Sequence, residues 1–235
     1  MPEPDVAALM ASAIEVPWQP SYRLVHSRFP PVSIFEACES AEELEIIALI
    51  QGLTKERILQ EQGALQRVPP EDQLFGHGTT PVMAAFCYVG TTPTRFSNGA
   101  YGVYYAANSL EVAVAEVTHH IERFMQATRP PAEPITLRCY SAQTQRPVVD
   151  IRGPAWTAAH KPDDYTAAQS LAQPLREAGA WGLLYRSVRA PGGECVALLR
   201  PPAVKTPVVQ HCHVNLNWDG ERIRTWYRIG ALKTL

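Results

Sequence analysis

Two side chains of the segment RFSNGAYGVYY, residues 95–105, have the chemistry to hold an anionic ligand. The guanidinium of Arg95 is a planar fork that donates two hydrogen bonds at once to phosphate or carboxylate oxygens. The Ser-Asn-Gly sequence behind Phe96 is flexible enough to let backbone N–H groups approach the same oxygens. Tyr105 offers a flat ring for stacking and a hydroxyl for a hydrogen bond. Tyr104 should face the core instead, because neighbours on a strand point to opposite faces.

Two later residues add catalytic chemistry. Glu116 could stabilise the positive charge that develops on a sugar ring when its bond to a leaving group breaks. Ser187 ends the apolar stretch WGLLYRS and could fix the orientation of a ligand by a hydrogen bond. Each residue taken singly has an ordinary alternative: a surface loop, a core ring, an i,i+4 pair of Glu116 with His120, or the end of a strand.

The order of these residues resembles the RES-domain family, which is named for an Arg, a Glu and a Ser. Its pattern is an Arg-aromatic-x-Asn-x₂-Gly loop, a strand ending in Tyr, a helical Glu eleven residues after that Tyr, and a later Ser. The chain has RFSNGAYG, YAANSLEVAVAE and GLLYRSVRAPGGECVALLRP in these places, and the resemblance spans about residues 22–227. It departs at Phe96, where Trp is common, and at Arg186, where Pro often precedes the Ser.

The resemblance implies an α+β fold of one domain, similar to the diphtheria-toxin-like ADP-ribosyltransferases, with mixed and antiparallel sheets flanked by helices. It implies NAD⁺ as the substrate, with Glu116, Arg95 and Ser187 as catalytic residues. Arg95, Tyr105 and Ser187 would bind NAD⁺. Apart from the resemblance, Arg23 on the first expected strand is a candidate for a second cationic contact to NAD⁺. The implied activity is cleavage of the nicotinamide–ribose bond and transfer of ADP-ribose to a protein, water or phosphate.

The resemblance also implies a biological setting. Family members are toxins of type II toxin–antitoxin pairs, so the expected partner is an Xre-like helix-turn-helix antitoxin that blocks the active site. A protein that accepts ADP-ribose is a second expected partner. The alternative function is a nucleotide-binding or partner-interaction module that does not turn its ligand over.

Apolar periodicity, together with capping and turn residues, predicts the helices and strands around these residues. SYRLVHS predicts a strand that carries Arg23, and Ser33 to Ile50 predicts a helix with an acidic face. Residues 54–68 predict a second short helix. From Asn108 we expect a helix capped by that residue, with Glu111 at the third helical position, and with an apolar stripe of Leu110, Val114, Val117, Ile121 and Phe124. Glu116 lies on the flank of this stripe, a position suited to a pocket rim.

The remaining segments predict strands and one helix. We expect strands at 135–140, 146–151, 181–187, 194–200, 206–218 and 222–227, with the closing two at a sheet edge, and a helix at 163–180 that ends near Gly179. No linker marks a boundary, so residues 1–20 are expected to be an N-terminal arm and residues 21–235 one RES-like domain, including helical elements within 33–66.

Charge and composition exclude other classes. A formal net charge of -2 gives no field suited to a nucleic-acid backbone, so no direct contact with nucleic acid is expected. The first twenty residues carry acids where a signal peptide carries positive charge, and no apolar run approaches the length of a membrane span. We therefore expect a cytoplasmic protein without membrane contact.

Metal and other nucleotide motifs are weak. The 5 cysteines are scattered without a CxxC pair, and they are expected to be buried thiols. His119 and His120 point to different sides of a helix, and His211 and His213 lack a third ligand nearby, so no metal is expected. The G-x-G-x-x-G and Walker patterns are missing.

Overall fold

The computed structural model describes residues 5–29, 34–52, 64–90 and 92–230. Their centre is an 8-stranded sheet in the order β4-β5-β6-β2-β1-β3-β7-β8. Its strands are β1 Ser21–His26, β2 Tyr104–Ala107, β3 Glu133–Thr144, β4 Val149–Asp150, β5 Gly182–Arg186, β6 Glu194–Leu198, β7 Val204–Trp218 and β8 Ile223–Ile229. The β4–β5 pair is parallel, and the other pairs are antiparallel. The prediction of an α+β fold with a mixed sheet is confirmed, and β8 does lie at an edge.

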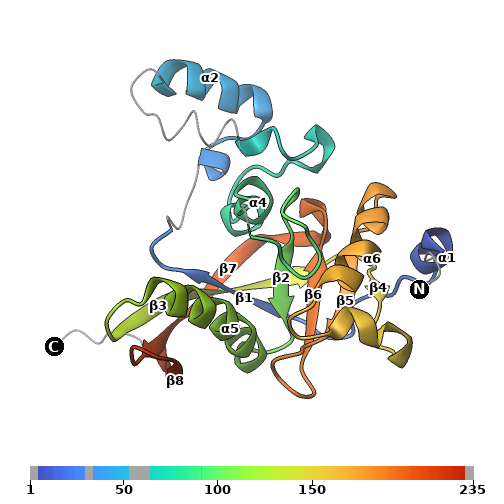
Figure 1. Cartoon of the computed structure of the whole chain (residues 1–235). Helices are drawn as coiled ribbons and strands as arrows, with labels where there is room; N and C mark the ends of the chain where they lie inside the picture. The colour runs from blue at the N-terminus through green and yellow to red at the C-terminus, as the bar shows by residue number, and fades with distance from the viewer. Residues whose placement is uncertain (1–4, 30–33, 53–63, 91, 231–235) are drawn as a thin grey trace.

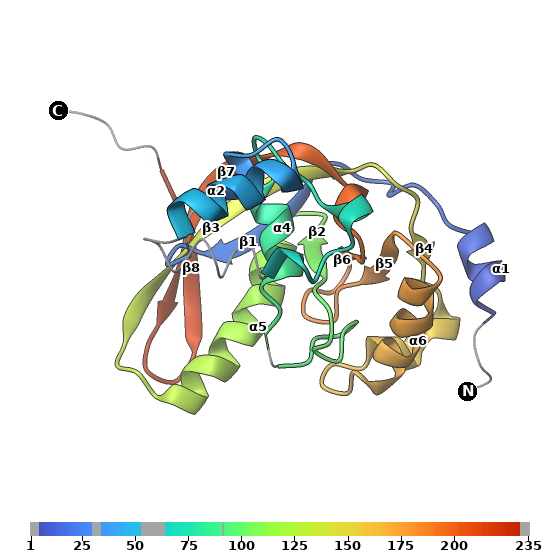
Figure 2. The same ribbon diagram turned by 90° about the horizontal axis from the view of Figure 1, so that it is seen from above.

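Helices cover both faces of this sheet. They are α1 Val6–Ala11, α2 Ala41–Gly52, α4 Thr80–Cys87, α5 Leu110–Thr128 and α6 Thr166–Glu177, with 3₁₀ turns at Ile34–Glu36, Pro70–Asp72, Pro154–His160 and Pro201–Ala203. Figure 1 shows α4 above the sheet and α5 below it, and Figure 2 shows the long β3 and β7 running side by side from above. None of the helices in the described ranges is long and apolar enough to cross a membrane.

The two faces are set by the alternation of strand residues. Tyr104 is 1% exposed and packs in the core beneath α4, as predicted, together with Val82 and Met83. Its neighbour Tyr105 faces the opposite side, against the core that α6 covers. This alternation is what carries the Tyr105 ring to the side of the sheet where α5 and α6 lie.

The sheet opens between β1 and β2. β1 pairs with β3 over its whole length, but its register with β2 is the single pair Tyr22 and Ala107. The two strands therefore separate beyond Tyr22, and the Nη1 atom of Arg23 donates to the Tyr105 carbonyl at 3.1 Å in the gap. A side-chain hydrogen bond thus takes the place of a ladder bond at this point.

The start of α5 corrects one prediction. Ser109, not Asn108, is the N-cap, and its hydroxyl accepts from the Val112 N–H at 3.2 Å. Glu111 is consequently the second helical residue, so no capping box forms. Asn108 instead extends the sheet, because its N–H donates to the Glu194 carbonyl at 2.9 Å and its side-chain oxygen accepts from the Glu194 N–H at 3.3 Å.

The helix predictions otherwise hold in part. The predicted helix at 33–50 is divided into Ile34–Glu36 and α2, because Ser40 caps α2 by accepting from the Glu43 N–H at 3.2 Å. The predicted helix at 54–68 lies largely outside the described residues. Phe124 was expected in the apolar stripe of α5, but its side chain is 54% exposed and stacks near the Arg28 guanidinium instead.

The N-terminal segment contacts the sheet. Ile14 forms a bridge to Val148, and the Trp18 indole donates to Glu194 at 2.7 Å. The same carboxylate accepts from Arg152 at 2.7 Å, and Arg152 also pairs with Asp150 at 2.7 Å. This network connects residues 14–18 to β4 and β6. The boundary at residue 20 stays a prediction.

Candidate functional site

Four of the five predicted site residues line one cavity. Arg23, Arg95, Tyr105 and Glu116 surround a space of about 240 Å³ that opens where β1 and β2 separate, and we call it the glutamate cavity. Its other walls come from α5, β6 and the loop before α6. The fifth residue, Ser187, lies behind the glutamate and contacts it.

The contact between Ser187 and Glu116 is the shortest polar contact of the site. The hydroxyl of Ser187 donates to Glu116 Oε1 at 2.5 Å, across 71 residues of sequence. The Ser187 hydroxyl oxygen in turn accepts from the backbone N–H of Arg189 at 3.2 Å and of Ala190 at 2.9 Å. Two amide donors therefore polarise the hydroxyl towards the carboxylate, which fixes one Glu116 oxygen and leaves the other for a ligand.

A glycine allows this contact to form. The Ser187 N–H donates to the Gly193 carbonyl at 2.8 Å, which closes the β5–β6 turn. A Cβ atom at Gly193 would lie 2.7 Å from a methyl group of Val112 in the first turn of α5. The bare glycine thus lets the turn pack directly on the helix that carries Glu116.

Arg95 lies in the cavity wall, and three of its five N–H groups already donate to the protein backbone. Its guanidinium donates to the carbonyls of Ala159 at 3.0 Å, Lys161 at 2.8 Å and Pro162 at 3.4 Å, and it stacks on the Tyr165 ring at 4.8 Å. The residue is 7% exposed. Arg95 therefore holds the loop before α6 against the sheet, a role that the sequence did not indicate.

The hydroxyl of Tyr105 is also committed. It accepts from the Phe96 N–H at 3.0 Å and lies 2.8 Å from Thr94 Oγ1. Burial raises the pKa of Tyr105 to about 12, so the phenol stays neutral at physiological pH. Its hydrogen bonds fix the start of the RFSNGAYG loop, while the ring lines the cavity.

Arg23 has the least satisfied guanidinium of the cavity. One nitrogen donates to the Tyr105 carbonyl, and the group stacks on the Tyr104 ring at 4.8 Å. Its Nε atom is enclosed without a hydrogen-bond partner, and the described residues include no carboxylate paired with it. Burial lowers the pKa of Arg23, which is the response of a cation that lacks a counter-ion. An anionic ligand would supply one.

Arg189 is a cavity residue that sequence reasoning missed. Its Nη2 atom contacts Asp163 at 2.9 Å, the Pro162 carbonyl at 2.6 Å and His119 at 2.8 Å. It ties the β5–β6 turn to the loop before α6 from the solvent side, while Arg95 ties the same loop from within. The one feature of the sequence that could have indicated Arg189 as a cavity residue is its position two residues after Ser187.

Three other titratable groups in the cavity are held in their neutral forms. Burial raises the pKa of Cys195 and of Tyr185 well above their usual values, so both stay protonated. Burial and the neighbouring His119 lower the pKa of His120, which leaves its imidazole neutral at pH 7. Glu116 is therefore the carboxylate that faces three arginines and otherwise neutral groups.

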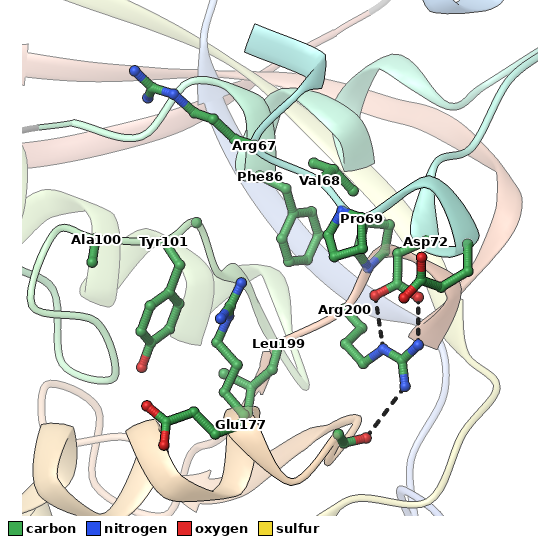
Figure 3. Close-up of a pocket in the computed structure, with 15 residues that line it drawn as sticks. Arg67, Val68, Pro69, Asp72, Phe86, Ala100, Tyr101, Glu177, Leu199 and Arg200 are labelled. Carbon is green, nitrogen blue, oxygen red and sulfur yellow. Dashed lines mark hydrogen bonds and ion pairs between the residues drawn. The ribbon is translucent and has the colours of Figure 1, made fainter. Parts of the chain in front are cut away.

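Two other kinds of candidate site are a metal-ligand cluster and the cavity near Pro69. The described residues contain no group of three or more His, Cys, Asp or Glu side chains placed to hold a metal ion. Figure 3 shows a cavity of about 330 Å³ between the segment around Pro69 and the end of α6. There Arg200 pairs with both oxygens of Asp72, at 2.7 and 2.8 Å, so its charge is satisfied within the protein.

Comparisons with a family model, a protein sequence and a solved structure each found a match to this chain. The family model of the RES domain matches residues 65–219. The uncharacterized protein y4oC of Sinorhizobium fredii is 26% identical over 211 residues, which cover 88% of this chain and 86% of that protein. The crystal structure of the M. tuberculosis MbcT-MbcA toxin-antitoxin complex aligns with a TM-score of 0.41 and 13% identity, over 95% of this chain and 91% of the other.

Fold and cavity define an α+β protein in which a partly buried glutamate–serine pair faces a cavity lined by several arginines. The family match covers about two thirds of the sequence, including Arg95, Tyr105, Glu116 and Ser187. The chain belongs to the RES domain family, and Arg23 lies outside the matched residues.

Proposed function

We propose that the protein cleaves the nicotinamide–ribose bond of NAD⁺ and transfers ADP-ribose to an acceptor. The observation that carries the proposal is that Glu116, fixed by Ser187 at 2.5 Å, faces the same cavity as Arg23, Arg95 and Tyr105. Apart from Arg23, this is the set expected from the family pattern, and it combines an anion for a developing cation with a cation for a phosphate.

The negative charge of Glu116 suits the part of the substrate that becomes positive in the reaction. As the C1′–N bond breaks, its electron pair goes to the nicotinamide ring, which leaves neutral, and positive charge develops on the ribose. The free oxygen of Glu116 stabilises that charge, and the hydrogen bond from Ser187 keeps the carboxylate from rotating away. The acceptor then forms the new bond to C1′ and loses its proton.

Arg23 supplies the contact to the phosphates in this scheme. Its guanidinium has an unpartnered donor and no carboxylate partner among the described residues, whereas Arg95 directs three of its N–H groups to backbone carbonyls. Arg95 shapes the wall on which the substrate lies, and the Tyr105 ring supports the nicotinamide by stacking. The ADP-ribosyltransferase-like fold that the family resemblance implies is part of the same proposal.

The biological role that fits this activity is that of a toxin. Loss of NAD⁺ or modification of an essential protein in the cytoplasm would arrest growth, so a neutralising partner is required. We propose an Xre-like antitoxin that covers the glutamate cavity.

Mass spectrometry of the reaction products tests the proposal and identifies the acceptor. Purified protein is incubated with NAD⁺ in phosphate-free buffer, in phosphate buffer, and with cell lysate. Free ADP-ribose, its 1″-phosphate or a modified protein then identifies water, phosphate or protein as the acceptor. NAD⁺ that binds, as calorimetry would show, but releases no nicotinamide in any mixture would establish the binding module instead.

A further inference from the structure

The glutamate cavity adjoins a larger one on the other side of the opening between β1 and β2. The second cavity measures about 580 Å³ and shares Arg23, Thr94 and Tyr105 with the first, so the two meet at these residues. We call it the α4 cavity, because Pro81, Ala84 and Ala85 of α4 form one wall. It contains none of the residues that hold Glu116.

The volumes of the two cavities indicate which part of a dinucleotide each could hold. At about 240 Å³, the glutamate cavity is smaller than the ~300–1,000 Å³ typical of pockets that enclose a whole drug-sized ligand. A dinucleotide is larger than a typical drug, so its second half must lie elsewhere. The α4 cavity is the neighbouring space that is large enough.

The charges of the lining residues match the three parts of a dinucleotide in order. The glutamate cavity holds the carboxylate that suits the cationic nicotinamide nucleoside. Arg23, at the junction, has the unpartnered nitrogen that suits the phosphates. In the α4 cavity Arg23 is the one charged residue among the described lining residues, and the rest are apolar, aromatic or hydroxylic.

The lining of the α4 cavity suits an uncharged aromatic base. Phe29 and Tyr88 are each 50% exposed and present ring surface at its edge, and Tyr140 adds a third ring. The exposed Thr92 contributes a hydroxyl group that can bond the polar edge of a purine. An acidic peptide would find a single cation here, and a basic one would find no anion among the described residues.

We propose that the α4 cavity is the binding site for the adenosine half of the substrate, with the pyrophosphate passing Arg23 through the opening in the sheet. This inference rests on the proposed function. It assigns the lining residues of α4, of 89–90 and of 97–103 to recognition of the substrate, a role separate from bond cleavage.

Two substrates and one variant test the inference. Nicotinamide mononucleotide carries the scissile bond and one phosphate but no adenosine, so the wild-type KM for it should exceed the KM for NAD⁺ at least tenfold. Ala84→Trp places an indole in the α4 cavity and should raise the KM for NAD⁺ at least tenfold while leaving the KM for the mononucleotide and both kcat values nearly unchanged. Gln173→Trp, on the exposed face of α6, is the matched control and should change neither KM.

The outcomes separate this inference from the proposed function. Equal KM values for the two substrates in the wild type would overturn the adenosine site, even if Ala84→Trp failed to fold. An Ala84→Trp protein that keeps its KM for NAD⁺ but modifies an acceptor protein more slowly would assign the cavity to the acceptor instead. Nicotinamide release from neither substrate would overturn the proposed function itself, and the inference with it.

Discussion

Replacing Ser187 by Ala tests how much the glutamate–serine contact contributes. The substitution removes a hydrogen bond to a charged group, worth about 1.5–3 kcal/mol, and leaves the amides of Arg189 and Ala190 without their acceptor. Since 1.4 kcal/mol corresponds to a tenfold change in rate, nicotinamide release should slow by about 10- to 100-fold. The loss should fall on kcat, because the contact orients the carboxylate in the transition state and does not touch the phosphates.

The assay is steady-state release of nicotinamide, with Tm measured on the same samples. Ser187→Thr is the control, because it keeps the hydroxyl and should retain most of the rate. If Ser187→Ala lowers Tm but leaves kcat within twofold of the wild type, the hydroxyl merely supports the turn and the reasoning is refuted.

Three further changes follow from the geometry. Arg95→Lys loses at least two of the three carbonyl contacts and should destabilise the fold by about 3 kcal/mol. In thermal melting this corresponds to a fall in Tm of about 6–12 °C. An unchanged Tm would show that other contacts hold the loop before α6. Arg23→Met should leave Tm unchanged or raise it, because it removes an enclosed cation without a counter-ion, but should raise the KM for NAD⁺ at least tenfold; a lower Tm with an unchanged KM would contradict this. Burial raises the pKa of Tyr104 and Tyr105 to about 12, from about 10 when unfolded, so the stability from their neutral phenols is complete below pH 10 and should be lost as the pH rises to 12. Circular dichroism melts over this range should show the fall, which Tyr105→Phe should reduce, and a flat profile would count against it.

Local patterns explain how much of the fold was predictable. The 3.6-residue period predicted α5 and placed Glu116 on the flank of its apolar stripe, where the structure has it lining the cavity. Strand alternation correctly assigned Tyr104 to the core. The cap of α5 was wrong by one residue, since Asn108 and Ser109 are both good caps and the choice depended on the pairing of Asn108 with Glu194, 86 positions away.

The partners of the arginines could not be predicted either, because they too lie far away in the sequence. Arg95 bonds to backbone carbonyls of residues 159–162, and carbonyls have no sequence signature. The opening between β1 and β2 depends on how two strands diverge, and nothing in SYRLVHS encodes it. The sequence therefore identified four residues that line one cavity, while the hydrogen-bond partners that make Arg95 a support of the loop required the structure.

The central claim is that the carboxylate of Glu116 promotes the departure of nicotinamide from NAD⁺. Glu116→Gln retains the size of the side chain and an acceptor for Ser187 but removes the negative charge. The most direct measurement is single-turnover release of nicotinamide by this variant beside the wild type, at saturating NAD⁺. We predict rapid release by the wild type and a rate lower by about 100-fold or more in Glu116→Gln, with NAD⁺ binding retained. Equal rates in the two proteins, or no release by the wild type, would contradict the account.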